Sequence, residues 1–514
     1  MLLKAKPLRL DAKKRVVILN MDDAAELDVK PMDRVELRVN GKRENAIVNV
    51  AEKAVAKGWI GIYSRVQEEL GVFSGQQIKV DPSDPPASLI FIKKRLNGTP
   101  LSRHEIMQIV RDVVNERLSE IELTSFVMSL YNHRMSINEA ADLSMAMAAT
   151  GKSLDLGKKR IYDKHSIGGV PGDKTSMMLV PIVAAAGLTI PKTSSRAITA
   201  PAGTADRMEC LCPVDLGLEE IKRVVSRTNG CLVWGGAVDL SPADDAFIRV
   251  EYPLSIDPLL LPSVMSKKKA VGAKYVVIDI PTGRGVKVKT VSEAEELANS
   301  FIELGKKLGM EVSCVSTFGE QPVGRGVGPA LEAREVLNSM MSPNRAPQDL
   351  VEKVARLSGE LFEFAGMKNP DSIAAEMLRT GKAERKLRQI MEAQGGDPDI
   401  GPEDIPVGSR KVTIRSAKPG RVWWINNTAV IEVARAAGAP KDKGAGILFH
   451  KKIGDAVRKG DVLFEVYADK AHKMNRALES KDKLSFMGIG KSMEMVIKEI
   501  PGDEEQDNYF VLER

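Results

Sequence analysis

Residues 160–176 read RIYDKHSIGGVPGDKTS, and the apolar run MMLVPIVAAAGLTI follows at 177–190. We expect a strand that ends near Ser166, a glycine-rich loop, and a helix that begins at residues 173–175. Glycines let backbone N–H groups approach an anion closely, and a helix N-terminus adds partial positive charge. The stretch therefore predicts an anion cradle at the end of a strand, with a plain polar turn as the alternative.

The same stretch supplies further hydrogen-bond donors around the loop. Candidate phosphate-binding residues are Lys164, His165, Ser166 and Ser176. The spacing is neither that of a Walker A loop nor that of a G-x-G-x-x-G fingerprint. Phosphate is the expected occupant, but the motif alone does not name a nucleotide.

Comparable loops recur between about residues 152 and 410, where short β-type runs alternate with helical patterns. The loops read KTSSRAITAPAGTAD (192–206), PTGRGVKVKT (281–290) and FGEQPVGRGVGP (318–329). Such alternation predicts a mainly parallel sheet covered by helices, with ligands at the carboxyl ends of the strands. Several glycine-rich, basic loops at one edge indicate a site that binds more than one anionic group.

The rest of the chain divides by its periodicity, and the whole is predicted to be a multidomain α/β protein. Residues 1–84 alternate apolar and polar positions and predict a small β-rich domain, for which we expect an assembly role. Residues 85–155 have helical periodicity, with capping boxes that pair a serine with a glutamate three residues later. The αβ domain is expected at 156–408, with some of its helices packed on the helical domain, and a C-terminal α+β domain at 409–514.

Two segments outside the αβ domain carry more specific predictions. Residues 81–88, DPSDPPAS, predict a linker with neither helix nor strand because of their prolines. Residues 444–469 alternate strands and tight turns as in barrel-sandwich carrier modules. They lack the Met-Lys tip that a swinging-arm carrier needs, which favours a structural role.

Composition limits the class of protein. The 514 residues are 43% hydrophobic, and 75 basic residues against 69 acidic ones give a net charge of +6. That excess is small for a chain of this length, so no nucleic-acid partner is expected. Residues 1–15 have no apolar core of a signal peptide, and no run reaches the roughly 20 apolar residues of a membrane span. We expect a cytoplasmic protein without a membrane partner, in which the four cysteines are reduced thiols.

The motif DKHSIGGVPGDKTS resembles the phosphate-binding signature D-K-H-S-x-G-G-V-G-D-x-T-S of the thymidine and pyrimidine nucleoside phosphorylases, with Pro171 as one extra residue. The resemblance covers residues 90 to about 500. Thymidine enzymes of bacteria carry an Arg-Asp pair ahead of an S-x-x-x-K motif, whereas this chain reads RVEYPLSIDPLLLPSVMSKK at 249–268. With the extra N-terminal β domain, the chain is more similar to the archaeal AMP phosphorylases.

This resemblance implies a reaction and roles for individual residues. The reaction is the phosphorolysis of AMP to adenine and ribose 1,5-bisphosphate in AMP breakdown, with CMP and UMP as further candidates. Asp257 matches the proton donor, Lys287 a nucleotide-binding lysine that could contact the 5′-phosphate, and Lys267 the base-side lysine of S-x-x-x-K. The remaining AMP-binding positions implied by the match are Gly169, Ser195, Arg196, Ala197, Ile198, Thr199, Ala200, Thr204 and Ser263.

The residues alone leave other interpretations open. Asp257 could equally be a turn cap before Pro258, and Lys267 a solvated member of a lysine run. The rival functions are a pyrimidine nucleoside phosphorylase, an anthranilate phosphoribosyltransferase relative, and a nucleotide-binding regulator without turnover. No metal and no cofactor are expected, with phosphate as co-substrate. The resemblance further implies a homodimer or a higher homo-oligomer.

Overall fold

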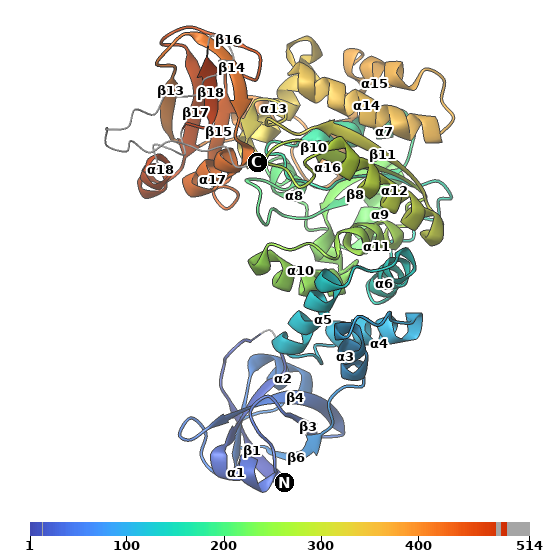
Figure 1. Ribbon diagram of the computed structural model, residues 1–514, viewed down its shortest axis with the longest axis vertical. Coiled ribbons are helices and arrows are strands. Elements are labelled where there is room, and N and C mark those ends of the chain that lie inside the picture. The colour runs from blue at the N-terminus through green and yellow to red at the C-terminus, as the bar shows by residue number, and fades with distance from the viewer. Residues whose placement is uncertain (13, 480–484, 491–514) are drawn as a thin grey trace, which may run out of the picture.

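The computed structural model describes residues 1–12, 14–479 and 485–490. The barrel lies at one end of the long axis of the molecule, and a small helical domain follows it (Figure 1). At the other end, the C-terminal β domain lies beside the αβ domain. The predicted multidomain α/β architecture is confirmed. Within the described ranges, no helix combines the length and apolar character that a membrane crossing needs.

The N-terminal domain is a closed barrel with strand order β1-β5-β2-β4-β3-β6. Its interior is filled by the inward-facing apolar residues of the alternating strands. The elements are β1 (Leu2–Pro7), β2 (Val16–Asn20), α1 (Met21–Glu26), β3 (Arg34–Val39), β4 (Lys42–Ala51), β5 (Trp59–Ile62), α2 (Ser64–Leu70) and β6 (Gln77–Ser83).

The linker prediction for residues 81–88 is wrong at both ends of the segment. Ser88 begins the helix Ser88–Leu96. Asp81, Pro82 and Ser83 belong to β6 and pair with β3. The residues of β6 after Lys79 are in register with β3 alone, whereas Gln77 and Ile78 are in register with β1. Proline is tolerated in a strand that is paired on one side only, because its missing N–H then costs no ladder hydrogen bond.

The helical domain forms one core from four successive helices and one helix from the αβ region. Its elements are α3 (Ser88–Leu96), α4 (Arg103–Val114), α5 (Glu120–Asn132), α6 (Ile137–Ala149) and α10 (Pro242–Leu254). The capping boxes predicted for α4 and α6 are present at Ser102 and Ser136, and α5 has a third at Ser119. Each box satisfies free N–H groups of a first helical turn and fixes where that helix begins.

The αβ domain contains five parallel strands. In one sheet β10 (Tyr275–Thr282) lies between β11 (Glu311–Phe318) and β7 (Tyr162–Ser166), and β8 (Ile190–Ser194) pairs with β9 (Gly230–Trp234). The Tyr162 N–H donates to the Thr189 carbonyl at 2.9 Å and links the two sets. Because the strands are parallel, their carboxyl ends meet at one edge, as predicted.

Separate apolar cores cover the two faces of this sheet, and alternate residues of β10 enter one or the other. The first core is built from α7, α14 and α16, and the second from α9, α11 and α12. The helices of the domain are α7 (Thr175–Ala185), α8 (Thr204–Met208), α9 (Leu218–Thr228), α11 (Leu260–Ala270), α12 (Val291–Leu308), α13 (Pro329–Met341), α14 (Gln348–Phe364), α15 (Pro370–Arg379) and α16 (Lys382–Ala393). Short 3₁₀ turns occupy Gly235–Val238, Pro343–Arg345 and Pro402–Asp404.

The C-terminal domain consists of two small antiparallel sheets and two helices around its own core. One sheet has the order β12-β15-β17-β13 and the other β16-β14-β18. The elements are β12 (Gly326–Val327), β13 (Arg410–Arg415), β14 (Gly420–Ile425), α17 (Asn427–Ala437), β15 (Gly446–Phe449), β16 (Ala456–Val457), β17 (Val462–Ala468), α18 (Ala471–Leu478) and β18 (Met487–Gly490). Strand β12 comes from the αβ domain, so the two domains share a sheet.

Candidate active site

The glycine-rich loop joins β7, which ends at Ser166, to α7, which begins at Thr175. Gly168, Gly169 and Gly172 have positive φ angles of 83°, 98° and 74°, a region that favours glycine. A Cβ on Gly172 would lie 2.9 Å from two carbonyl oxygens of the 323–326 segment. The sequence therefore needs glycine here both for the backbone angle and for close packing.

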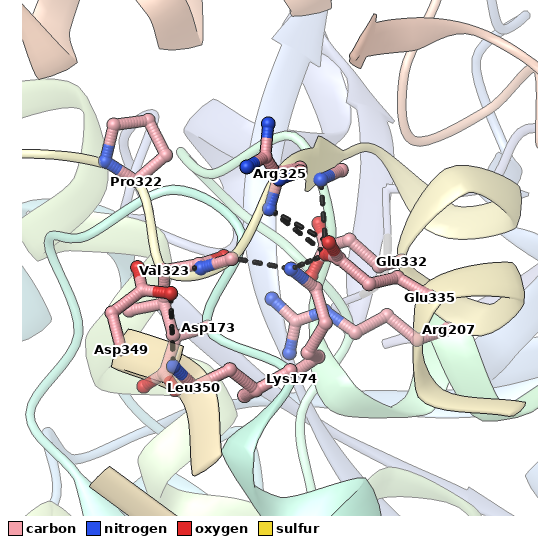
Figure 2. Close-up of polar contacts among 12 residues, drawn as sticks. Asp173, Lys174, Arg207, Pro322, Val323, Arg325, Glu332, Glu335, Asp349 and Leu350 are labelled. Atoms are coloured by element: carbon pink, nitrogen blue, oxygen red, sulfur yellow. Dashed lines mark hydrogen bonds and ion pairs between the residues drawn. The ribbon is translucent and has the colours of Figure 1, made fainter. Parts of the chain in front are cut away.

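Lys174 stands at the N-cap position of α7, and its side chain joins the end of the glycine loop to the 323–326 segment and to α13. Its buried ammonium donates to the Val323 carbonyl at 2.7 Å and to Glu335 at 2.6 Å. Figure 2 shows Lys174 reaching between these two residues. From the C-terminal domain, Lys452 donates to the Gly324 carbonyl at 2.6 Å and to Asp349 at 3.0 Å. Two lysines from different domains thus hold the segment on which the glycine loop rests.

Lys164, a predicted phosphate donor, lies buried in a group of four charges on one face of β7. Its ammonium is 3.4 Å from Asp279 and 3.9 Å from Asp173. Lys353 of α14 contacts the same carboxylates at 2.9 and 3.7 Å. Burial alone would raise the pKa of Asp173, but the two lysines more than offset it and hold that pKa well below its usual value. Two positive charges here balance two negative ones.

Asp163 and His165 lie on the opposite face of β7. Asp163 is 2.6 Å from the Lys268 ammonium and 3.7 Å from that of Lys192, and all three side chains are buried. Burial and the nearby lysines, led by Lys268 and Lys192, lower the pKa of His165 well below its usual value. The imidazole is therefore neutral near pH 7 and can donate one hydrogen bond.

The second loop, residues 195–200, follows β8 and is held in place by its own arginine. The Arg196 guanidinium binds Glu209 through two hydrogen bonds of 2.7 and 2.8 Å and stacks 4.9 Å from the Trp234 ring. Asp206 accepts the Ala197 N–H at 2.7 Å. These contacts occupy the Arg196 side chain, whereas Ser195 and Thr199 are exposed.

The C-terminal domain also reaches this loop. Arg435 of α17 donates to the Ile198 carbonyl at 2.7 Å and to the Ala200 carbonyl at 3.5 Å. Thr204 begins α8 directly after the loop, and its hydroxyl accepts from Arg207 at 3.4 Å. The loop is thus bound on one side by α8 and on the other by α17.

Asp257 and Lys287 form an ion pair of 2.5 Å, and both side chains are exposed. Asp257 lies between α10 and α11, and Lys287 follows β10. A Cβ on Gly169 would lie 3.2 Å from the Lys287 backbone nitrogen, so the glycine loop and this pair are neighbours. The structure thereby brings together the predicted proton donor, the predicted 5′-phosphate ligand and the anion loop.

Glu251 of α10 supports the segment that carries Asp257. One of its carboxylate oxygens accepts the Leu259 N–H at 3.1 Å, and the side chain is buried. Burial, with smaller contributions from Asp257 and Asp244, raises the pKa of Glu251 to about 7. A carboxyl group that can hold a proton near neutral pH thus lies beside the candidate acid.

Ser263 and Lys267 lie one turn apart on α11. The Lys267 ammonium donates to the Ser263 hydroxyl at 3.4 Å and pairs with Asp244 of α10 at 2.5 Å. Since α10 packs in the helical domain, Lys267 connects that domain to the αβ domain. Ser176 lies buried in the first turn of α7, where its backbone N–H is free of intrahelical partners by position.

Sequence reasoning missed several charged residues that surround these positions. Asp163 stands in the motif itself and Lys192 lies in β8, three residues before the second loop, so both could have been found by their position next to predicted residues. Asp279 lies inside an apolar strand, where a lone acid is a recognisable signal. Lys353 sits in an ordinary amphipathic helix pattern, and nothing local distinguishes it.

Three comparisons with known proteins bear on the family of the chain. Residues 90–151 match the helical bundle domain and residues 158–384 the a/b domain of the glycosyl transferase family, and residues 422–485 match the pyrimidine nucleoside phosphorylase C-terminal domain. An AMP phosphorylase of Thermofilum pendens is 49% identical over 497 residues, which are 96% of this chain and 97% of that protein. The chain belongs to the AMP phosphorylase family.

Further AMP phosphorylases agree with this assignment. That of Thermococcus kodakarensis is 48% identical and covers 93% of this chain and 96% of its own, and AMP phosphorylase 1 of Archaeoglobus fulgidus is 47% identical with 93% and 95% coverage. The resemblance inferred from the motif is thereby confirmed. Anthranilate phosphoribosyltransferase from Thermus thermophilus superposes with a TM-score of 0.51 at 18% identity, over 59% of this chain and 98% of its own. That likeness concerns the fold alone.

Proposed function

We propose that the protein catalyses the phosphorolysis of nucleoside 5′-monophosphates, in which AMP and phosphate give adenine and ribose 1,5-bisphosphate. The observation that carries this proposal is the position of Lys287, whose backbone lies against Gly169 and whose ammonium reaches Asp257. One residue thus joins an anion loop to a carboxyl group. The family of the chain supports AMP as substrate, with CMP and UMP as further candidates.

In this proposal the attacking phosphate lies on the glycine loop. Backbone N–H groups of the loop and the first turn of α7 face the anion, and the partial positive charge of the helix N-terminus favours it. Ser166 and Ser176 add hydroxyl donors, and neutral His165 adds one N–H. Lys164 would contribute its charge from within the group that it forms with Asp173 and Asp279.

The reaction then requires phosphate on one side of C1′ of the ribose and a proton donor beside the base. A phosphate oxygen attacks C1′ of the ribose, the C1′–N9 bond breaks, and its electron pair leaves with adenine. Asp257 donates a proton to a ring nitrogen of the departing base. Positioning can lower the barrier by roughly 7 to 11 kcal/mol in the best cases, and a general acid typically contributes about 10² to 10⁴ in rate.

Lys287 has a part in this step because its one ammonium group cannot pair closely with both the Asp257 carboxylate and the 5′-phosphate. When the ammonium turns to the 5′-phosphate, Asp257 is released from this ion pair and can turn to the base. The 5′-phosphate would thus prepare the acid as well as anchor the substrate. Ser263 and Lys267 would lie on the base side, and residues 195–200 with Thr204 along the nucleotide.

A pyrimidine nucleoside phosphorylase is the second candidate, because residues 422–485 match a C-terminal domain named for that activity. A direct experiment separates the two. Purified protein is incubated with AMP, CMP, UMP, GMP, adenosine and thymidine, with and without phosphate, and free bases are separated by chromatography. Phosphate-dependent release from monophosphates supports the proposal, whereas release from thymidine alone would overturn it.

The proposal includes no cofactor beyond the co-substrate phosphate. In the described part of the chain, no three His, Cys, Asp or Glu side chains gather as metal ligands would. EDTA should accordingly leave the rate unchanged. We further propose a cytoplasmic homo-oligomer, supported by four cysteines outside disulfides and by the exposed Ile90 and Ile121 of the helical domain. Light scattering coupled to gel filtration measures the mass.

A further inference from the structure

The charged groups around β7 are balanced on one face and unbalanced on the other. On the face of α14, Lys164 and Lys353 are matched by Asp173 and Asp279. On the face of α11, Asp163 alone is shared by two ammonium groups. Asp163 is 0% exposed, Lys268 1% and Lys192 4%, so solvent does little to compensate the difference.

The neighbouring ion pairs do not remove this surplus. Lys267 has Asp244 at 2.5 Å, and Lys287 has Asp257 at the same distance, so each of these lysines is matched by a carboxylate of its own. His165, on the same face as Asp163, is neutral near pH 7 and adds no negative charge. Among the described residues, the group of Asp163, Lys192 and Lys268 therefore has two buried amino groups for one carboxylate.

A buried ammonium without a carboxylate of its own is costly, and groups perturbed in this way cluster at functional sites. The location of this group fits such a role. Lys192 lies in β8, two residues before that strand ends at Ser194. Asp163 lies in β7, three residues before that strand ends at Ser166 and the glycine loop begins. The group of Asp163, Lys192 and Lys268 thus lies close to the carboxyl ends of β7 and β8, where the two loops begin.

We propose that Lys192 is a positioning residue for the phosphate co-substrate, and that the bound dianion supplies the negative charge missing from the group of Asp163, Lys192 and Lys268. The inference rests on the proposed function. Lys192 was not among the predicted site residues. Its ammonium donates to the Thr193 carbonyl at 2.9 Å, within β8 and outside both loops.

Binding of the dianion should also change the protonation of this group. Burial and the Lys268 charge lower the pKa of Lys192 well below its usual value, against the opposing effect of Asp163. The titratable groups that face Lys192 are Asp163, Lys164 and His165 of β7, Lys268 of α11 and the buried Cys231 thiol of β9. An anion arriving at the edge favours the protonated ammonium, so binding should take up a proton.

The kinetic test compares Lys192→Met with Lys269→Met. Lys269 lies next to Lys268 on α11, is exposed and donates to the Leu308 carbonyl, away from the site. In Lys192→Met we expect the KM for phosphate to rise about tenfold or more, because no ammonium can form there to offset the charge of the bound dianion, while the KM for AMP changes less than about twofold. Lys269→Met should resemble the unmodified protein. Equal changes in both KM values, or none, would overturn the inference.

The calorimetric test uses sulfate, a dianion that takes up no proton near pH 8. Titration in two buffers of different ionisation enthalpy should show proton uptake by the unmodified protein and by Lys269→Met, and none by Lys192→Met. Uptake that persists in Lys192→Met and disappears in His165→Gln would assign the proton to His165 and sink the inference.

A second variant, in which a negative charge is removed from the group in place of a positive one, keeps the test decisive should Lys192→Met fail to fold. Asp163→Asn removes the shared negative charge and should tighten sulfate binding, and weaker binding by a folded Asp163→Asn protein counts against the inference. Failure of the unmodified protein to release base from AMP in the presence of phosphate would instead refute the proposed function. AMP turnover with an unchanged phosphate KM in Lys192→Met refutes the inference alone.

Discussion

The Lys287 ammonium lies 2.5 Å from the Asp257 carboxylate, at the point where the segment between α10 and α11 meets the glycine loop. The pair is exposed, so its own contribution to stability is small, roughly 0 to 1 kcal/mol. We therefore expect the pair to matter through what each partner does when a ligand separates them.

Replacing Asp257 by Asn should remove the proton donor and leave the shape of the site unchanged. We expect kcat to fall by about 10² to 10⁴, while AMP binding, measured by equilibrium dialysis, stays within about twofold. A fully active Asp257→Asn enzyme would refute the proton-donor role and favour the turn cap before Pro258.

Replacing Lys287 by Met should reduce the preference for nucleotides over nucleosides. The variant loses the cation for the 5′-phosphate, yet Asp257 is then free of its partner with every substrate. We expect kcat/KM for AMP to fall by at least about tenfold, and kcat/KM for adenosine to stay level or rise. Arg284→Met, in the same loop and paired with Glu320, is the matched control. Loss of activity toward both substrates in equal proportion would contradict this prediction.

Glu251 should make the stability of the protein depend on pH. Its pKa is raised from 4.5 to about 7 in the folded protein, so the folded state holds this proton more firmly than the unfolded chain. The stabilisation is complete below about pH 4.5 and is lost as the pH rises through 7, by an amount on the order of 3 kcal/mol. The difference in Tm between Glu251→Gln and the unmodified protein should therefore grow from pH 5 to pH 8, and a constant difference would show that Glu251 does not titrate there.

Two glycines of the anion loop separate backbone strain from crowding. A methyl group on Gly168 would meet no atom within 4 Å, whereas one on Gly172 would lie 2.9 Å from the Val323 and Gly326 carbonyl oxygens. We expect Gly168→Ala to lower the free energy of unfolding by about 1 kcal/mol and Gly172→Ala by several times more, roughly 3 kcal/mol. Thermal unfolding of both variants checks the order, and equal losses would show that the loop can move away from the 323–326 segment.

The sequence predicted the fold where periodicity and turn residues act locally. Strand β10 could be read from its apolar run, and α4 and α6 from their capping boxes. The β6 extension through Pro82 could not, because it depends on pairing with β3, more than 40 residues earlier in the chain. The prediction of a linker used only the local preference of proline.

The candidate site was predictable in its loops and not in its charge balance. Asp257 and Lys287 were placed by motif, yet their direct pairing depends on how α10 docks against the αβ sheet. Lys353 completes the group around Asp279 from a helix whose sequence pattern is that of any amphipathic helix. Ion pairs between distant elements arise from packing, and no local pattern encodes them.

The two-residue strand β12 has a consequence for how this protein can be divided. Its pairing with β15, together with Lys452 and Arg435, means that the C-terminal domain supports both anion loops from outside. Shortening the protein at residue 408 would remove those supports together with the C-terminal domain. The barrel, by contrast, stands at the far end of the molecule (Figure 1) and could be exchanged as a cassette without touching either loop.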